Sequence, residues 1–167
     1  MWYHSRHTPM LNVYLDNAWI TIGSFTLITP AYLLSEDLTS TTLKEMELYL
    51  DVVRYSCTIV RLMDDLGTST DELQRGDVSK SIQCYMKEKN VSEAVTRDHI
   101  KYLIRENWKG LNGEKIGRSK FEESFKRFVI NFPRMAHLLY QYGDGFGKPN
   151  HETRVRIIYL LIEPIAL

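Results

Sequence analysis

The sequence predicts an all-α fold, because its apolar residues follow the helical period and capping residues mark the ends of the periodic segments. Apolar side chains recur at steps of three and four, and no segment of useful length alternates as a half-buried strand would. Ser, Thr or Pro precedes several of these segments, and Gly or Pro follows others. The 167 residues, 44% of them apolar, are enough for one domain with a sizeable core.

The first long helix is expected to run from about Met10 to about Leu34, with interruptions. Thr8-Pro9 supplies an N-cap followed by a proline that favours the first helical turn. Gly23-Ser24 and Pro30 both lie inside this segment. Each is expected to break or kink the helix.

A second helix is expected to begin at a capping box formed by Thr42 and Glu45 and to reach about Glu72. Arg75-Gly76, directly afterwards, is a helix-stop signal. One face of this helix carries an apolar stripe that indicates burial, made of Met46, Leu50, Val53, Cys57 and Val60.

The next two helices are expected over about residues 78–87 and after Ser92, which provides an N-cap. Ser119 and Glu122 then form a capping box for a further helix, which Pro133 interrupts and should bend. The apolar side of the helix after Ser92 is expected to comprise Val95, Ile100, Ile104 and Trp108. That of the helix after Ser119 is expected to comprise Phe121, Phe125, Phe128, Phe132 and Met135.

The chain is expected to finish with a loop and a last helix. Residues 142–147 contain three glycines and indicate a flexible loop. The last helix is expected over about residues 152–162, with Pro164 ending it.

Asp64, Thr68 and Glu72 stand at positions i, i+4 and i+8 and form the most informative pattern in the chain. On a helix these side chains stack along one face, about 6 Å apart per step. Two carboxylates and a hydroxyl are the hard oxygen donors that Mg²⁺ and Mn²⁺ prefer. Arg61 lies one turn earlier on the same face, where its guanidinium could hold an anion beside the metal. This donor row therefore predicts a metal site that suits a diphosphate.

The donor row also continues the apolar stripe of its helix and so is expected to face inward. Unpaired carboxylates in such a place would be costly, and a bound cation is the usual remedy. The alternative is that the helix frays near Gly67 and that the acidic side chains are solvated.

Composition excludes several classes of function. The 21 basic and 21 acidic residues cancel, so nothing favours a nucleic-acid or anionic-membrane partner. Cys57 and Cys84 lack the spacing of a metal or redox site and indicate buried thiols. The opening residues 1–7 contain no apolar run, so neither a signal peptide nor a membrane span is expected there.

The segment from Asp64 to Glu72, Asp-Asp-Leu-Gly-Thr-Ser-Thr-Asp-Glu, together with the residues that follow it as far as Met86, closely resembles a known pattern. It is similar to the second metal-binding motif and the following loop of plant class I terpene synthases, and most similar to the monoterpene synthase branch. Residues 14–19, 140–147 and 156–164 extend the resemblance along almost the whole chain. The fold it implies is the C-terminal part of the class I terpenoid synthase α-helical bundle.

This resemblance implies roles for individual residues of the motif. Asp64, Thr68 and Glu72 would hold one Mg²⁺ or Mn²⁺, and Arg61 and Lys80 would bind the substrate diphosphate. Both cations are also sensible from the sequence alone, since they flank the donor row.

The resemblance also implies roles outside the motif. Tyr140 and Asp144 would belong to a closing loop and the roof of the cavity; the alternatives are a packed tyrosine and an ordinary turn aspartate. Gly23 and Ser24 would lie at a helix break whose carbonyls face a carbocation, although the family more often has Ser-Gly-Pro where this chain has Gly-Ser-Phe.

One feature of the family has no counterpart in the chain. The family carries an Asp-Asp-x-x-Asp site on a facing helix, whereas Asp64 and Asp65 are the only adjacent aspartates here. Residues 1–167 are therefore expected to be the C-terminal portion of a catalytic domain, without the N-terminal helical domain and the first aspartate-rich motif.

The resulting expectation is a Mg²⁺-dependent terpene synthase that acts on a prenyl diphosphate, with geranyl diphosphate favoured, and that is inactive as residues 1–167 alone. The alternatives are a non-catalytic truncated helical protein and a metal- or diphosphate-binding module. Self-association through exposed apolar surface is also expected. A full-length monoterpene synthase would belong in the plastid, and otherwise the cytoplasm is expected.

Overall fold

The structure is a computed structural model that describes residues 2–5, 7–35, 46–113, 116, 121–145 and 147–162, and all its regular structure is helical. This confirms the predicted all-α fold. The helices are α1 (Trp2–Ser5), α2 (Leu11–Thr21), α3 (Ser24–Ser35), α5 (Met46–Gln74), α6 (Ser81–Lys89), α7 (Glu93–Asn112), α9 (Glu123–Tyr140) and α10 (His151–Leu161).

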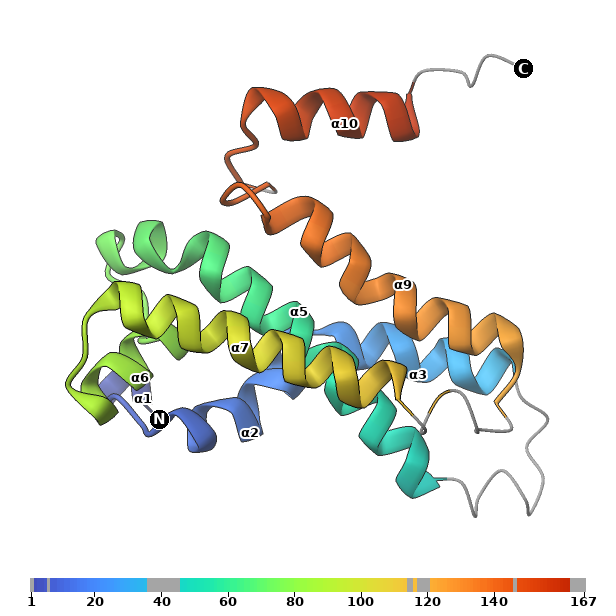
Figure 1. Ribbon diagram of the computed structural model, residues 1–167, viewed down its shortest axis with the longest axis horizontal. Coiled ribbons are helices and arrows are strands. Elements are labelled where there is room, and N and C mark those ends of the chain that lie inside the picture. Colours follow the sequence, from blue (N-terminus) through green and yellow to red (C-terminus); the bar gives the residue numbers. More distant parts are fainter. Residues whose placement is uncertain are drawn as a thin grey trace.

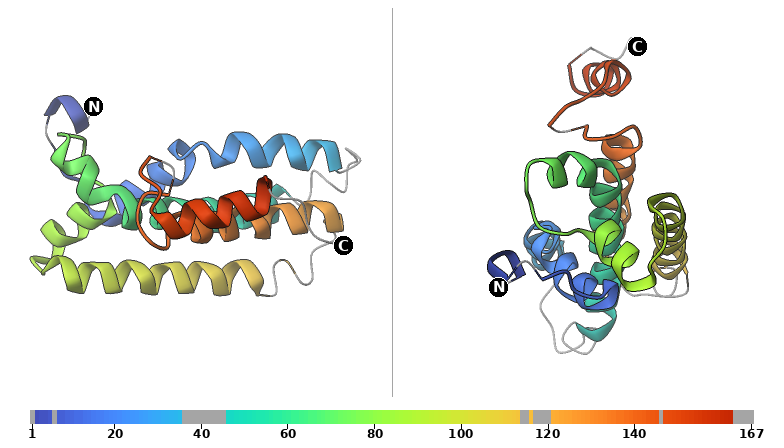
Figure 2. Two further views of the ribbon diagram at one scale, coloured as in Figure 1. Left: turned by 90° about the horizontal axis from the view of Figure 1, so that it is seen from above. Right: turned by 90° about the vertical axis from the view of Figure 1, so that its left-hand side faces the viewer.

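The long helix α5 is the centre of the arrangement (Figure 1). Its most extensive contacts are with α9 and α7, and it also packs against α2, α3 and α6. Helix α10 follows the C-terminal end of α9 and stands apart from this bundle in Figure 1 and in the right-hand view of Figure 2. None of the helices in the described part of the chain is long and apolar enough to cross a bilayer.

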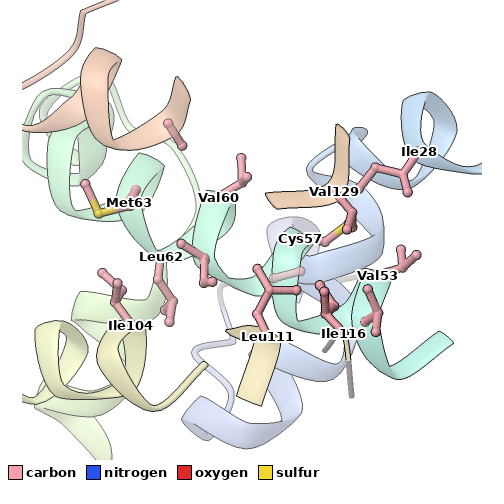
Figure 3. Close-up of a cluster of buried hydrophobic side chains, with 14 of the residues drawn as sticks. Ile28, Val53, Cys57, Val60, Leu62, Met63, Ile104, Leu111, Ile116 and Val129 are labelled. Atoms are coloured by element: carbon pink, nitrogen blue, oxygen red, sulfur yellow. The ribbon is translucent and has the colours of Figure 1, made fainter. Parts of the chain in front are cut away.

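Residues from helices that precede α5 in the chain and from helices that follow it pack on α5 to form the core (Figure 3). Val53, Cys57 and Leu62 of α5 are fully buried. They belong to one cluster with Ile28 of α3 and Val129 of α9, which are also fully buried. Both cysteines are free and buried, as expected. Because the core is organised around α5, the donor row on that helix has a rigid support.

The first predicted helix is divided at Gly23, as expected, but not at Pro30. Gly23 has a φ of 83°, a conformation that favours glycine, and α2 and α3 lie on either side of it. Helix α3 continues from Ser24 through Pro30 to Ser35, so the predicted break at Pro30 is wrong, and a kink there stays a prediction. Ile28 and Tyr32 flank Pro30 and are both buried, and this packing outweighs the lost backbone hydrogen bond.

Helix α5 ends close to the predicted stop. Gly76 has a φ of 82°, and the Asp77 N–H donates to the Glu72 carbonyl at 3.0 Å, which caps the last turn. Leu50 is 43% exposed, so its predicted place in the buried stripe is wrong, whereas Val53, Cys57 and Val60 are buried. Thr42 and Glu45 lie outside the described residues.

The later helices follow the prediction at most of their boundaries. Helix α6 begins at Ser81 rather than near residue 78. Ser92 caps α7 by accepting the Val95 N–H at 3.4 Å, as predicted. Helix α9 runs without a break through Pro133, so the interruption expected there is wrong, while the expected bend stays a prediction. Ser119 and Pro164 lie outside the described residues.

Besides Leu50, three apolar residues that were assigned to buried faces of α7 and α9 are exposed, namely Val95, Phe128 and Met135. The buried side of α9 instead comprises Phe125, Val129, Pro133 and Ala136, and Thr96 is buried on α7 where Val95 was expected.

Candidate metal centre

The three residues of the donor row lie on one uninterrupted stretch of α5. The Thr68 hydroxyl lies 3.0 Å from Glu72 Oε2 and 3.0 Å from the Asp64 carbonyl oxygen, so it can donate to either. The helix does not fray at Gly67, and the side chains of Asp64 and Glu72 are only 15% and 17% exposed. The alternative of a frayed helix with solvated acids is therefore wrong.

A cation lies at each end of the donor row. Arg61 Nη1 is 2.9 Å from Asp64 Oδ2, and Lys80 Nζ is 3.4 Å from Glu72 Oε2. Burial raises the pKa of the Asp64 carboxyl, and Arg61 opposes this effect by favouring the charged form. The structure thus brings together the five residues Arg61, Asp64, Thr68, Glu72 and Lys80.

The turn after α5 and the start of α6 place Lys80. Lys80 is the N-cap residue of α6, and its N–H donates to the Gln83 side-chain oxygen at 2.9 Å. Its ammonium also lies 3.7 Å from Asp77 Oδ2. This local cap fixes the backbone of Lys80, so the position of its side chain beside Glu72 follows from α6 as well as from the ion pair.

Tyr140 and Asp144, the two residues assigned to a closing loop, lie at the end of α9 and just after it. Tyr140 hydrogen-bonds the Asp64 carboxylate, and burial followed by the charge of Asp64 raises the pKa of the tyrosine. Asp144 contributes to the same rise, while its Oδ1 accepts the Gly147 N–H at 2.7 Å. Tyr140 therefore reaches the donor row, and Asp144 also has the role of a turn aspartate.

Asp65 is a buried charged residue that the sequence analysis did not single out. Its side chain is 0% exposed and accepts hydrogen bonds from the Tyr14 hydroxyl and the Ser81 N–H. Arg61 Nη1 lies 3.5 Å from its Oδ1. The adjacent aspartate pair could have indicated a separate role for Asp65. Neighbouring positions on a helix differ by about 100°, so Asp64 and Asp65 cannot both face the donor row.

Arg97 of α7 was also missed, and it supports the motif from a neighbouring helix. Its Nη1 donates to the Leu66 carbonyl at 2.9 Å, and its Nη2 donates to Thr70 Oγ1 at 3.1 Å. Nothing in the spacing of α7 pointed to this contact, since it depends on how α5 and α7 pack.

The donors of the row fit a small, hard divalent cation. Two partly buried carboxylates and one hydroxyl supply oxygen only, and Mg²⁺ usually completes its shell with water and phosphate oxygens. In the described residues there is no group of three or more His, Cys, Asp and Glu that could hold a metal. The row contains two such residues, so a metal held there would need further oxygens from a ligand.

Residues 1–110 match the terpene synthase family, metal binding domain. The chain therefore belongs to the terpene synthase family, and the resemblance read from the motif is confirmed. It is 48% identical over 167 residues to the chloroplastic myrcene synthase of Quercus ilex and 48% identical over 165 residues to the (-)-alpha-terpineol synthase of Vitis vinifera. These matches cover 99% and 98% of the chain but 28% of each relative, so the chain spans about 28% of the length of these curated relatives.

Solved structures of related enzymes have the same fold as this chain. A limonene synthase with 2-fluorolinalyl diphosphate superposes with a TM-score of 0.87 at 40% identity, covering 99% of the chain and 31% of that structure. The isoprene synthase of grey poplar leaves, in complex with three Mg²⁺ ions and dimethylallyl-S-thiolodiphosphate, gives a TM-score of 0.83 at 31% identity, covering 99% and 32%. The class I terpenoid synthase fold expected from the sequence is thus confirmed.

Proposed function

We propose that this chain supplies part of the metal-binding domain of a Mg²⁺-dependent terpene synthase, which ionises a prenyl diphosphate and releases diphosphate. The single observation that carries the proposal is the donor row of Asp64, Thr68 and Glu72, which has a cation at each end. Membership of the terpene synthase family supports the same activity.

In this proposal Asp64, Thr68 and Glu72 bind one Mg²⁺, and Mn²⁺ would suit the same oxygen donors. The bound metal would stabilise the negative charge that develops on the diphosphate leaving group. Arg61 and Lys80 bind the diphosphate oxygens, because each is a cationic side chain that already lies at the row. Tyr140 and Asp144 close the site from the end of α9 and keep water away.

Geranyl diphosphate is the substrate we propose. The support is that a relative of this chain is a monoterpene synthase of Hedychium coronarium, and that the limonene synthase structure holds 2-fluorolinalyl diphosphate. We also propose a plastid location for the whole enzyme, since the related myrcene synthase of Quercus ilex is chloroplastic.

Calorimetric titration with Mg²⁺ and inorganic pyrophosphate tests the site. The chain should bind Mg²⁺ weakly, and more tightly when pyrophosphate is present. Asp64→Asn combined with Glu72→Gln should abolish this metal-dependent binding. Asp71→Asn is the matched control, because Asp71 belongs to the same helical turn but pairs with Lys148 at 3.1 Å. An unchanged titration in the double variant would show that the site is assigned to the wrong residues.

A second measurement separates an enzyme from a binding module. The chain combined with the preceding part of a related synthase should convert geranyl diphosphate to terpene products in the presence of Mg²⁺. Metal-dependent pyrophosphate binding without any product in that combination would favour the non-catalytic module.

A further inference from the structure

Asp65 connects three separate elements through one buried carboxylate. The Tyr14 hydroxyl of α2 donates to it at 2.9 Å and 3.1 Å, to the two carboxylate oxygens. The Ser81 N–H at the start of α6 donates to Oδ2 at 3.1 Å, and Arg61 of α5 lies 3.5 Å from Oδ1. A carboxylate with no exposed surface persists in its charged form only with such partners.

Two of these partners lead directly to the cations of the donor row. Arg61 is itself one of them, and it reaches Asp64 with the same Nη1 atom that faces Asp65. Ser81 follows Lys80 in the chain, so the hydrogen bond from its N–H fixes the backbone beside the second cation.

We infer that Asp65 is a positioning residue that sets where Arg61 and Lys80 stand relative to each other, and so determines the affinity of the site for diphosphate. This inference rests on the proposed function, in which these two cations bind the diphosphate. Asp65 itself does not bind the metal, because its carboxylate is fully buried and already surrounded by the three donors. Asp64, its neighbour in the chain, remains the ligand.

The guanidinium of Arg61 is held from several sides, which gives the inference a second structural support. Its Nε donates to the Ala18 carbonyl of α2 at 3.4 Å. Helix α2 therefore restrains Arg61 directly, in addition to holding Asp65 through Tyr14. The Nη1 of Arg61 lies between two carboxylates, 2.9 Å from Asp64 Oδ2 and 3.5 Å from Asp65 Oδ1. Without the Asp65 charge, Arg61 would lose one of the two carboxylates that hold its Nη1, and its guanidinium would no longer be fixed in place.

Asp65→Asn tests this role, because it keeps the size of the side chain and removes its charge. Mn²⁺ alone, followed by electron paramagnetic resonance, should bind Asp65→Asn within about twofold of the original chain, whereas Asp64→Asn should lose that binding. Metal-dependent affinity for inorganic pyrophosphate should fall about tenfold or more in Asp65→Asn, equivalent to about 1.4 kcal/mol. Loss of Mn²⁺ binding equal to that of Asp64→Asn, or unchanged pyrophosphate affinity, would overturn the inference.

A double-mutant cycle distinguishes positioning from a general structural role. If Asp65 acts through Arg61, the effect of Asp65→Asn on pyrophosphate affinity should largely disappear in the Arg61→Gln background. Fully additive effects of the two changes would overturn the inference. Should Asp65→Asn lose its helical circular dichroism, Tyr14→Phe removes one donor only and should weaken pyrophosphate binding two- to threefold; an unchanged affinity there would also count against the role.

Two readouts without any ligand keep this test separate from the proposed function. In Asp65→Asn, phenylglyoxal should modify Arg61 several times faster, as followed by peptide mass spectrometry. Amide hydrogen exchange of the segment that contains Ser81 should also accelerate. If the original chain binds no pyrophosphate at all, the proposed function fails, and these two rates still decide whether Asp65 holds both elements.

Discussion

Gly67 of α5 lies directly against Tyr140 of α9, at the point where the end of α9 meets the donor row. A Cβ atom at position 67 would lie 3.0 Å from Cδ1 of Tyr140 and 3.0 Å from the Gly143 carbonyl oxygen. The absence of a side chain at Gly67 therefore lets the segment after α9 approach α5 closely. It also lets Tyr140 hydrogen-bond Asp64, one turn earlier on the same helix.

Gly67→Ala should displace the segment around residues 140–145 while preserving helix α5. Alanine favours a helix by about 1 kcal/mol over glycine, which offsets much of the about 1–3 kcal/mol cost of overpacking. We expect a change of about 1 kcal/mol or less in urea unfolding, together with faster amide exchange in residues 140–145. Leu73→Ala, at an exposed position of α5, is the control. Unaltered exchange in residues 140–145 would contradict the proposed packing.

Stabilisation by Mg²⁺ should depend on pH. The pKa of the Asp64 carboxyl is raised above 3.8, mainly by burial, so without metal the folded chain holds this proton more tightly than the unfolded chain does. The stability that this proton contributes is present below the ordinary pKa of aspartate and is lost as pH rises through the raised value. Mg²⁺ binds the ionised carboxylate, so the stability that Mg²⁺ contributes increases as pH rises and is lost as the carboxylate is protonated.

The increase in melting temperature on addition of Mg²⁺ should therefore be full near pH 7 and small near pH 4, at roughly equal Mg²⁺ concentrations. A concentration of about 100 times the Kd would contribute about 2.7 kcal/mol where the site is ionised. Asp64→Asn combined with Glu72→Gln should show no Mg²⁺ effect at either pH. An increase that is equal at both values would argue against Asp64 as a ligand.

The chain should self-associate through apolar side chains that its own fold leaves uncovered. Leu27 and Leu34 of α3 are 57% and 89% exposed, and Ile20 of α2 is 48% exposed. Large exposed apolar patches are unusual in monomers and favour association. Sedimentation velocity should show concentration-dependent oligomers, and Leu27→Gln with Leu34→Gln should reduce them. Leu73→Gln on α5 is the control, and a monomer at all concentrations would refute the expectation.

Residues 1–167 alone should not convert geranyl diphosphate at a useful rate. Asp64, Thr68 and Glu72 are expected to hold one metal, and the sequence contains no second pair of adjacent aspartates. When the chain is combined with the preceding part of a related synthase, Asp64→Ala should lower kcat by about 100-fold or more, as expected when an electrostatic stabiliser is lost. Arg61→Ala should also lower activity, through lost diphosphate contacts.

Headspace gas chromatography with Mg²⁺ and geranyl diphosphate measures this directly. The Asp71→Asn variant should retain activity in the combined protein, because its carboxylate pairs with Lys148 outside the row. Abundant terpene formation by residues 1–167 alone would show that one metal site is sufficient.

The sequence predicted what depends on periodicity along one helix. The i, i+4, i+8 spacing of Asp64, Thr68 and Glu72 placed them on one face, and continuation of the buried stripe correctly indicated that they are partly buried. Gly23 correctly marked a break, because the positive φ that glycine allows depends on that residue and not on contacts with other helices.

What could not be predicted depends on contacts between helices. Asp65 is set apart from Asp64 only by what lies on its side of α5, namely α2 and the start of α6. Phe128 and Met135 continued an apolar pattern that was wider than the face α9 buries, so periodicity alone assigned them to the core. Pro30 was expected to break its helix because proline removes a backbone hydrogen bond, but the burial of Ile28 and Tyr32 on either side keeps α3 continuous.

The adjacent aspartates Asp64 and Asp65 make the motif intolerant of any change in helical register. Each residue added to or removed from α5 between the core and the motif turns everything beyond it by about 100°. One added residue would carry Asp64 to the place of Asp65, toward the Tyr14 hydroxyl, and Asp65 to the place of Leu66, which packs against the apolar core. Point substitutions can alter this site gradually, whereas an insertion or deletion between Cys57 and Asp64 would displace the metal ligand and the buried carboxylate together.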